Sequence, residues 1–179
     1  MNSWQRAFLE NEFLTLTTNG ALQRSSTYRS DLDAKEKSQA AKTMRSALGT
    51  ALREISSRYS QIVTEEQHTR NIEEFRRRVQ ETCRSFLRDG RLRFGVAQKA
   101  LNLYLKYAWC VGWIVRPPHC PFDRRLIQDI LQFRNDDWTK VDDQQTYIKW
   151  VKRAEEMRIA ANDESIADWE LRIWNASRR

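Results

Sequence analysis

A lysine and an aspartate near the middle of the chain have the surroundings best suited to chemistry. Lys99 occurs early in an apolar segment with helical spacing, Val96 to Val111. An amine there is expected to be desolvated, which lowers its pKa and makes it a nucleophile. Asp123 follows the proline turn Pro121-Phe122 and is expected to open the next helix. The helix dipole at such a position favours the ionised carboxylate.

Two neighbouring features indicate contact with phosphate. Gly95 stands where a loop is expected to turn into the helix of Lys99, so backbone N–H groups at this helix start could meet an anion. Eight arginines against four acids occur between Arg70 and Arg93. This concentration favours a phosphate-facing surface. A solvated helix face is the alternative for any such run of charge.

The order Gly-Val-x-x-Lys, apolar helix, short loop and Pro-x-Asp resembles the core of the helix-hairpin-helix DNA glycosylases. It is most similar to the 8-oxoguanine glycosylase branch, including its archaeal type, over residues 93–125. The resemblance implies that Lys99 attacks the sugar C1′ and that Asp123 stabilises the developing sugar cation. It also implies nucleic-acid contacts for seven residues: Arg91, Arg93, Gly95, Val96, Ala97, Arg124 and Arg125.

The chain departs from this family pattern in three ways. Arg93-Phe94 replaces the usual Leu-Pro, and Ala97 replaces the second hairpin glycine, which weakens the expected contact between hairpin and phosphate. The 24 residues from Lys99 to Asp123 lie between the spacings of the two branches. The base-reading pocket has no clear counterpart. Five residues are candidates for it, although large aromatic side chains more often belong to a core: Asn102, Trp109, Trp113, His119 and Trp138.

Other interpretations of the same residues stay open. Lys99, Asn102 and Lys106 are spaced to form a solvated stripe, and Asp123 also fits a plain N-cap. The chain could then be a non-catalytic helical nucleic-acid-binding protein. It could also be a helical protein-interaction module of a bacterial accessory or defence system, whose acidic C-terminal half meets a basic partner. No cofactor or metal is expected, because the histidines and cysteines lack the paired spacings of zinc sites.

The elements that must position these residues are predicted to be helices. Five glycines and three prolines in 179 residues are few, which favours long helices over the many turns of a β fold. We expect one compact all-α domain over residues 1–179, with a helix-hairpin-helix element near 75–110. Apolar spacing predicts helices at 4–16, 31–63, 64–87, 96–111, 124–133, 143–161 and 164–176.

Charge and composition indicate which partners and which cellular location to expect. The net charge of +7 makes a polyanion a reasonable partner, and the resemblance specifies double-stranded DNA. Three cysteines with no framework of spacings favour reduced thiols and a cytoplasmic location. Neither a signal peptide nor a membrane span is indicated. The oligomeric state is left open.

Overall fold

The computed structural model describes residues 1–176 of the chain, and these residues form helices without any β-strand. The all-α prediction is therefore confirmed. Three shorter helical segments complete the described part: η1 (Ser57–Ser60) and η2 (Arg88–Gly90) are 3₁₀ turns, and η3 (Arg125–Ile130) is a π-helix. The α-helices are α1 (Ser3–Leu22), α2 (Ala34–Ser56), α3 (Glu65–Cys83), α4 (Phe94–Cys110), α5 (Gln144–Ala160) and α6 (Ile166–Ala176).

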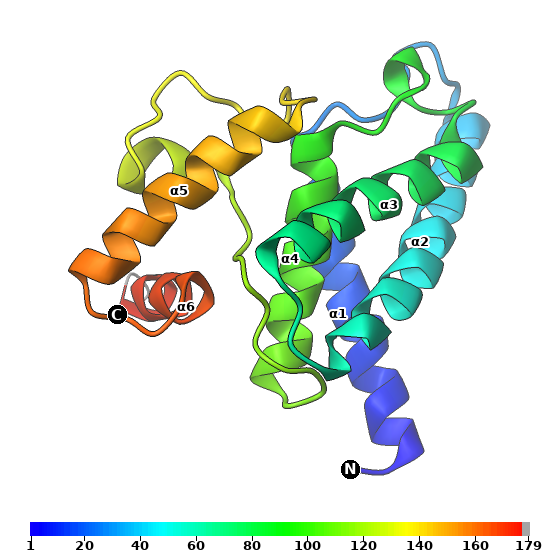
Figure 1. Cartoon of the computed structure of the whole chain (residues 1–179). Coiled ribbons are helices and arrows are strands. Elements are labelled where there is room, and N and C mark those ends of the chain that lie inside the picture. The colour runs from blue at the N-terminus through cyan, green and yellow to red at the C-terminus, as the bar shows by residue number, and fades with distance from the viewer. Residues whose placement is uncertain (177–179) are drawn as a thin grey trace.

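The central element is α4, which carries the apolar segment around Lys99. It packs against α1 and α3, and α2 packs in turn on α3. In Figure 1, α2 and α3 lie on one side of α4, while α5 and α6 lie on the other. Most of the residues of α4 are buried, including the polar Gln98 and Asn102. A helix enclosed on nearly all sides provides a rigid support for the side chains it carries.

Side-chain caps define where several helices begin. Asn2, Asp33 and Thr64 each form a capping box, in which the side chain accepts a hydrogen bond from the third residue of the helix. That residue in turn accepts a bond from the backbone N–H of the cap, so two otherwise unpaired donors are satisfied. Thr64 thus begins the helix at the residue where the sequence predicted its start. Asp143 caps α5 in a simpler way, by accepting the N–H of Thr146 at 2.7 Å.

Several predicted boundaries are wrong. Helix α1 continues through Asn19-Gly20 to Leu22, because Gly20 makes a close helix contact: an added Cβ would lie 2.8 Å from the Leu103 side chain. The helix expected over 31–63 ends at Ser56 and is followed by η1. The helix expected over 124–133 is the shorter π-helical η3.

A hydrophobic core joins the helices into one packed unit. It runs from Phe13 in α1 to Trp169 in α6 and includes the fully buried Phe122 of the segment between α4 and η3. Polar groups lie inside it as well: His68 bonds to Tyr59 at 2.7 Å, and His119 bonds to Tyr147 at 2.7 Å. None of the helices in residues 1–176 has the length and apolar character needed to cross a bilayer.

Candidate functional site

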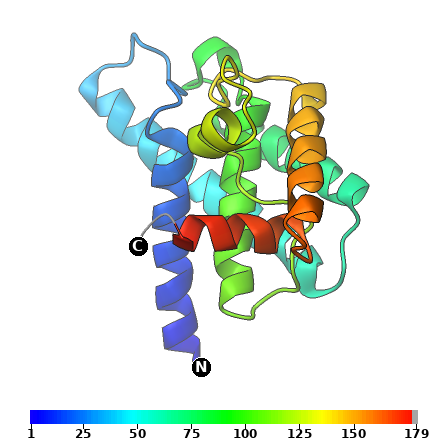
Figure 2. The same cartoon turned by 90° about the vertical axis from the view of Figure 1, so that its left-hand side faces the viewer.

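A cavity of about 950 Å³ opens beside α4. Its walls come from four parts of the chain: the end of α1, Lys99 of α4, the region of η3 and the segment 137–139, with Trp174 of α6 at its border. In Figure 2, α1 lies beside α4, and η3 and α6 lie in front of it. The residues that line it are Gly20, Gln23, Arg24, Lys99, Asp123, Arg124, Arg125, Gln128, Asp129, Asp137, Trp138, Thr139 and Trp174.

Lys99 reaches this cavity from the central helix. Its Nζ lies 4.1 Å from the centroid of the Trp138 ring, at the distance of a cation–π contact. Burial lowers the pKa of the amine, the nearby Asp123 carboxylate raises it, and Arg24 lowers it further. The net shift is downward. A larger fraction of Lys99 is therefore neutral, and so nucleophilic, than for a lysine in water.

Asp123 lines the same cavity and comes from the segment that leads into η3. Its Oδ1 accepts the Leu126 N–H at 3.0 Å, and its backbone carbonyl accepts the Ile127 N–H at 2.9 Å. The residue thus caps the turn that leads into η3, as the sequence predicted, and its charge raises the pKa of Lys99 as well. The Asp123 carboxylate therefore both caps a helical turn and lines the cavity.

A smaller chamber of about 440 Å³ adjoins the cavity and shares Gly20, Lys99, Asp123 and Trp174 with it. It holds an ion pair in which Lys106 Nζ lies 2.6 Å from Glu170 Oε2, with both side chains nearly buried. Burial raises the pKa of Glu170, and the ammonium of Lys106 opposes this shift. Lys106 also lies 5.1 Å from the centroid of the Trp174 ring.

The start of α4 differs from the prediction of a phosphate-binding turn. Gly95 donates its N–H to the Val141 carbonyl at 2.9 Å, and an added Cβ would lie 1.8 Å from the Trp138 carbonyl oxygen. Val96 and Ala97 are buried too. These three residues are therefore not placed to contact phosphate, contrary to the prediction. The glycine instead lets the segment 138–141 lie against α4, which brings Trp138 over Lys99.

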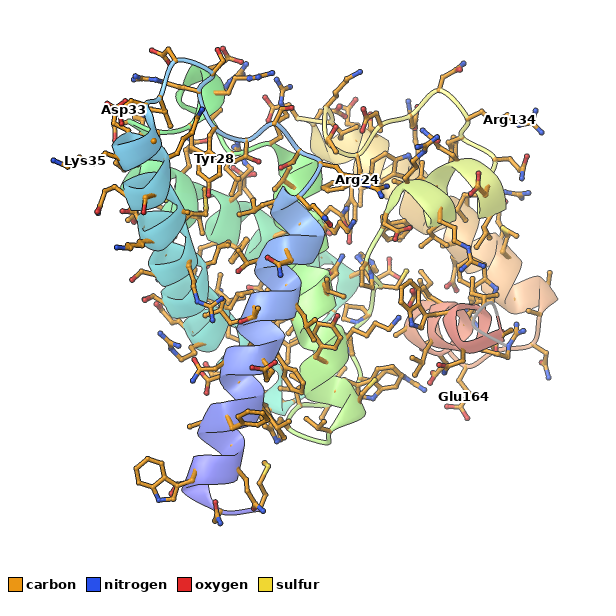
Figure 3. All side chains as sticks on the ribbon, turned by 180° about the vertical axis from the view of Figure 1, so that it is seen from behind. Arg24, Tyr28, Asp33, Lys35, Arg134 and Glu164 are labelled. Atoms are coloured by element: carbon orange, nitrogen blue, oxygen red, sulfur yellow. The ribbon has the colours of Figure 1, made fainter. Side chains whose placement is uncertain are left out.

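The arginines ahead of this segment are largely engaged with acids. Arg91 lies 3.2 Å from Asp142, and Arg93 lies 3.8 Å from Asp89 while donating to the Lys140 carbonyl. Four more of the run form ion pairs with glutamates: Arg70, Arg76, Arg77 and Arg78. This surface is less positive than its arginine count suggested. Three exposed arginines, Arg24, Arg124 and Arg125, line the cavity instead; Arg24 lies just beyond the end of α1 (Figure 3).

Of the five candidates for a base pocket, Trp138 alone lines the cavity of Lys99. Asn102 is fully buried and donates to the Cys120 carbonyl at 2.9 Å, so the alternative of a solvated stripe with Lys99 and Lys106 is wrong. His119 is a core residue bonded to Tyr147. Trp113 packs against Phe13, and Trp109 borders a separate crevice with Pro117.

Other residues of the site were missed by the sequence analysis. Arg24 and Trp174 line the cavity from opposite ends of the chain, in segments whose composition carries no signal for it. Gln98 did have a signal, since an amide within an apolar helix needs a polar partner when it is buried. Its partner is the backbone of Phe122, immediately before Asp123.

The described residues contain no group of three His, Cys, Asp or Glu side chains placed to hold a metal ion. Cys83, Cys110 and Cys120 are free thiols. No known protein family, curated protein or solved structure matches this chain. The interpretation of the site therefore depends on its own chemistry.

Proposed function

We propose that the protein is a DNA-binding base-excision enzyme in which Lys99 is the nucleophile and Asp123 the electrostatic stabiliser. The observation that carries this proposal is the meeting of Lys99 and Asp123 in one cavity of about 950 Å³. A cavity of this size admits a nucleotide extruded from a duplex, since ligand sites commonly occupy roughly 300–1,000 Å³. Extrusion costs a few kcal/mol of unstacking.

The two side chains have complementary roles in this chemistry. As the glycosidic bond breaks, the base leaves with the bonding electrons and takes up a proton, and the sugar gains positive charge at C1′. The Asp123 carboxylate stabilises that charge, while the neutral amine of Lys99 forms the new N–C1′ bond. Ring opening of this adduct gives a Schiff base, from which strand cleavage can follow. The lowered pKa of Lys99 supports the nucleophilic role.

Arginines at the border of the cavity support a substrate that carries phosphates. Arg24, Arg124 and Arg125 line it from two separate parts of the chain. Guanidinium groups bind phosphate oxygens through paired hydrogen bonds. These three side chains take the place of the helix-start amides expected at Gly95, because the Gly95 amide is bonded to Val141.

Borohydride trapping tests the proposal directly. The intact protein is incubated with duplexes that each carry one damaged or modified base, and reduction then fixes any Schiff base as a covalent adduct. We expect an adduct that Lys99→Gln and Lys99→Arg both abolish, and that Asp123→Asn lowers by about 100-fold, in line with the loss of one electrostatic stabiliser. Lys149→Gln, which changes an exposed lysine on α5, serves as the matched control and should trap normally.

Non-catalytic binding of nucleic acid is a second candidate, favoured by the contact of Lys99 with Trp138 and by the three arginines of the cavity. In that case the panel yields no adduct, but the protein binds DNA or RNA with an affinity that falls steeply with salt. Loss of binding in Arg24→Gln and Arg124→Gln would assign the interaction to this cavity. A protein that binds no nucleic acid even at low salt would contradict both candidates.

A further inference from the structure

Gln98 is the neighbour of Lys99 on α4, but its side chain is fully buried in the core. Its amide contacts both backbone groups of Phe122: Nε2 donates to the carbonyl at 2.7 Å, and Oε1 accepts the N–H at 3.2 Å. A side chain that pairs with both groups of one residue fixes the position and the direction of the chain there. The next residue is Asp123.

Other contacts attach the same stretch to α4 and α5. Asn102, one turn after Gln98, donates to the Cys120 carbonyl at 2.9 Å. The Phe122 ring packs edge to face on Tyr147, with 5.4 Å between the ring centroids. Residues 120–123 belong to no helix or strand. Side chains therefore hold this stretch in place where regular backbone bonding does not.

We propose that Gln98 is a positioning residue: by holding the backbone of Phe122 it fixes the Asp123 carboxylate relative to the Lys99 amine. This inference rests on the proposed function, because it takes Lys99 and Asp123 to be the reactive pair. Gln98 itself lines neither of the two cavities. It acts through the backbone of Phe122 and does not touch a substrate.

Release of Phe122 has a consequence for Lys99 that can be measured. Asp123 before η3 and Arg24 beyond α1 shift the pKa of the amine, and the Trp138 ring covers it. Four other charged side chains line the same cavity: Arg124, Arg125, Asp129 and Asp137. Asp123 raises the pKa of Lys99, whereas burial and Arg24 lower it. If Asp123 is displaced, burial and Arg24 still lower the pKa of Lys99. The pKa of Lys99 should then fall further.

The test is an NMR titration of lysine amines in the intact protein after reductive methylation with ¹³C-formaldehyde. The Lys99 signal is identified by its absence in Lys99→Arg. Gln98→Met keeps the length of the side chain but removes both bonds to Phe122. We expect it to shift the Lys99 titration to lower pH, in the same direction as Asp123→Asn. In the double variant Gln98→Met/Asp123→Asn, the shift should not exceed that of Asp123→Asn alone. Both changes remove the same interaction, that of the Asp123 carboxylate with the Lys99 amine.

A matched control and a second variant make the result decisive. Gln80→Met removes a different amide, which accepts the Leu92 N–H at 3.1 Å, and should leave Lys99 unchanged. Gln98→Asn retains an amide but is one methylene too short to reach both groups of Phe122, and it serves if Gln98→Met does not fold. An unchanged Lys99 titration in a folded Gln98 variant, or a shift that adds fully to that of Asp123→Asn, overturns the proposal.

The titration uses no nucleic acid, so its outcome is separate from that of the trapping experiment. If Asp123→Asn itself leaves the Lys99 titration unchanged, there is no interacting pair to position and the inference fails. If the shifts appear as expected but no lesion gives an adduct, the positioning role of Gln98 holds and the base-excision chemistry is the part that fails.

Discussion

Among single residues, Gly95 sets the strictest steric condition on the candidate site. A Cβ added there would lie 1.8 Å from the Trp138 carbonyl oxygen, which is backbone and has little freedom to move. Gly95→Ala should therefore push the segment 138–141 away from α4. We expect it to lower the free energy of unfolding by about 3 kcal/mol, measured by urea denaturation.

Gly112→Ala is the comparison for this prediction. Gly112 has a φ of +74° and nothing within 4 Å of an added Cβ, so the substitution introduces backbone strain without a clash. Its expected cost is roughly 1–2 kcal/mol. Equal costs for the two variants would contradict the steric exclusion of a side chain at Gly95.

Residue types in the sequence indicated part of the site. Lys99 and Asp123 could each be singled out because an amine in an apolar helix and a carboxylate at a helix start have distinct environments, and the family resemblance joined them as a pair. The role of Gly95 could not, since the atom that excludes a side chain belongs to Trp138 in a distant segment. The ion pair of Arg91 with Asp142, which offsets the charge of this arginine, could not be predicted either. Such contacts depend on the path of the chain in space.

Among the helices, α3 begins at a cap whose contribution can be measured. Thr64 accepts the Gln67 N–H at 3.2 Å, and the Gln67 side chain accepts the Thr64 N–H at 3.0 Å. Thr64→Ala removes the first of these bonds and should lower the free energy of unfolding by about 1 kcal/mol, measured by thermal or urea denaturation. Thr64→Asn retains a capping side chain and should stay close to the wild type. A loss of the same size in both variants would contradict the capping role.

For the helices, the apolar spacing of the sequence predicted their positions well and their ends less well. The apolar stripes of α3, α4 and α5 are regular enough to predict these helices directly, and the predicted start of α3 at residue 64 is correct. The end of α1 was missed, because a glycine that normally stops a helix here permits close packing on Leu103. Short-range patterns also did not reveal that η3 is a π-helix.

For the whole molecule, two buried histidines predict how stability depends on pH. Burial lowers the pKa of His68 to about 3 and lowers that of His119 as well, and the two rings pack edge to face. In the unfolded chain both titrate near the ordinary value of about 6.5. Below that pH the unfolded state binds more protons than the folded state, so stability is complete above about 6.5 and falls as the pH decreases toward 3.

The slope should approach about 1.4 kcal/mol per pH unit for each histidine in this window. Urea denaturation at a series of pH values between about 7.5 and 5 measures it. Glu170, whose pKa is raised in the fold, acts in the opposite direction. The comparison with His119→Gln therefore isolates the imidazole: this variant should show a shallower slope than the wild type. The same slope in both proteins would exclude His119 as a source.

The arrangement of the helices in space is the part of the fold that could not be predicted from the sequence. Composition predicted an all-α chain, and the burial of α4 followed from its apolar surface. The position of η3 and α6 across from α1, which creates the cavity, depends on long-range contacts such as those of Phe122 and Trp150. A cavity formed between segments far apart along the chain leaves no local pattern to read.

The parts of the chain that line the cavity differ in how firmly they are held. Lys99 stands on the most enclosed helix, whereas Asp123 and Trp138 belong to the stretch between α4 and α5, in which η3 is the one helical segment. Regions with little regular backbone bonding open locally at a lower free-energy cost than buried helices do. Under mild denaturing conditions the cavity should thus lose one wall while the amine keeps its place. Ligand entry through the same motion would move the carboxylate and the indole and leave the lysine still.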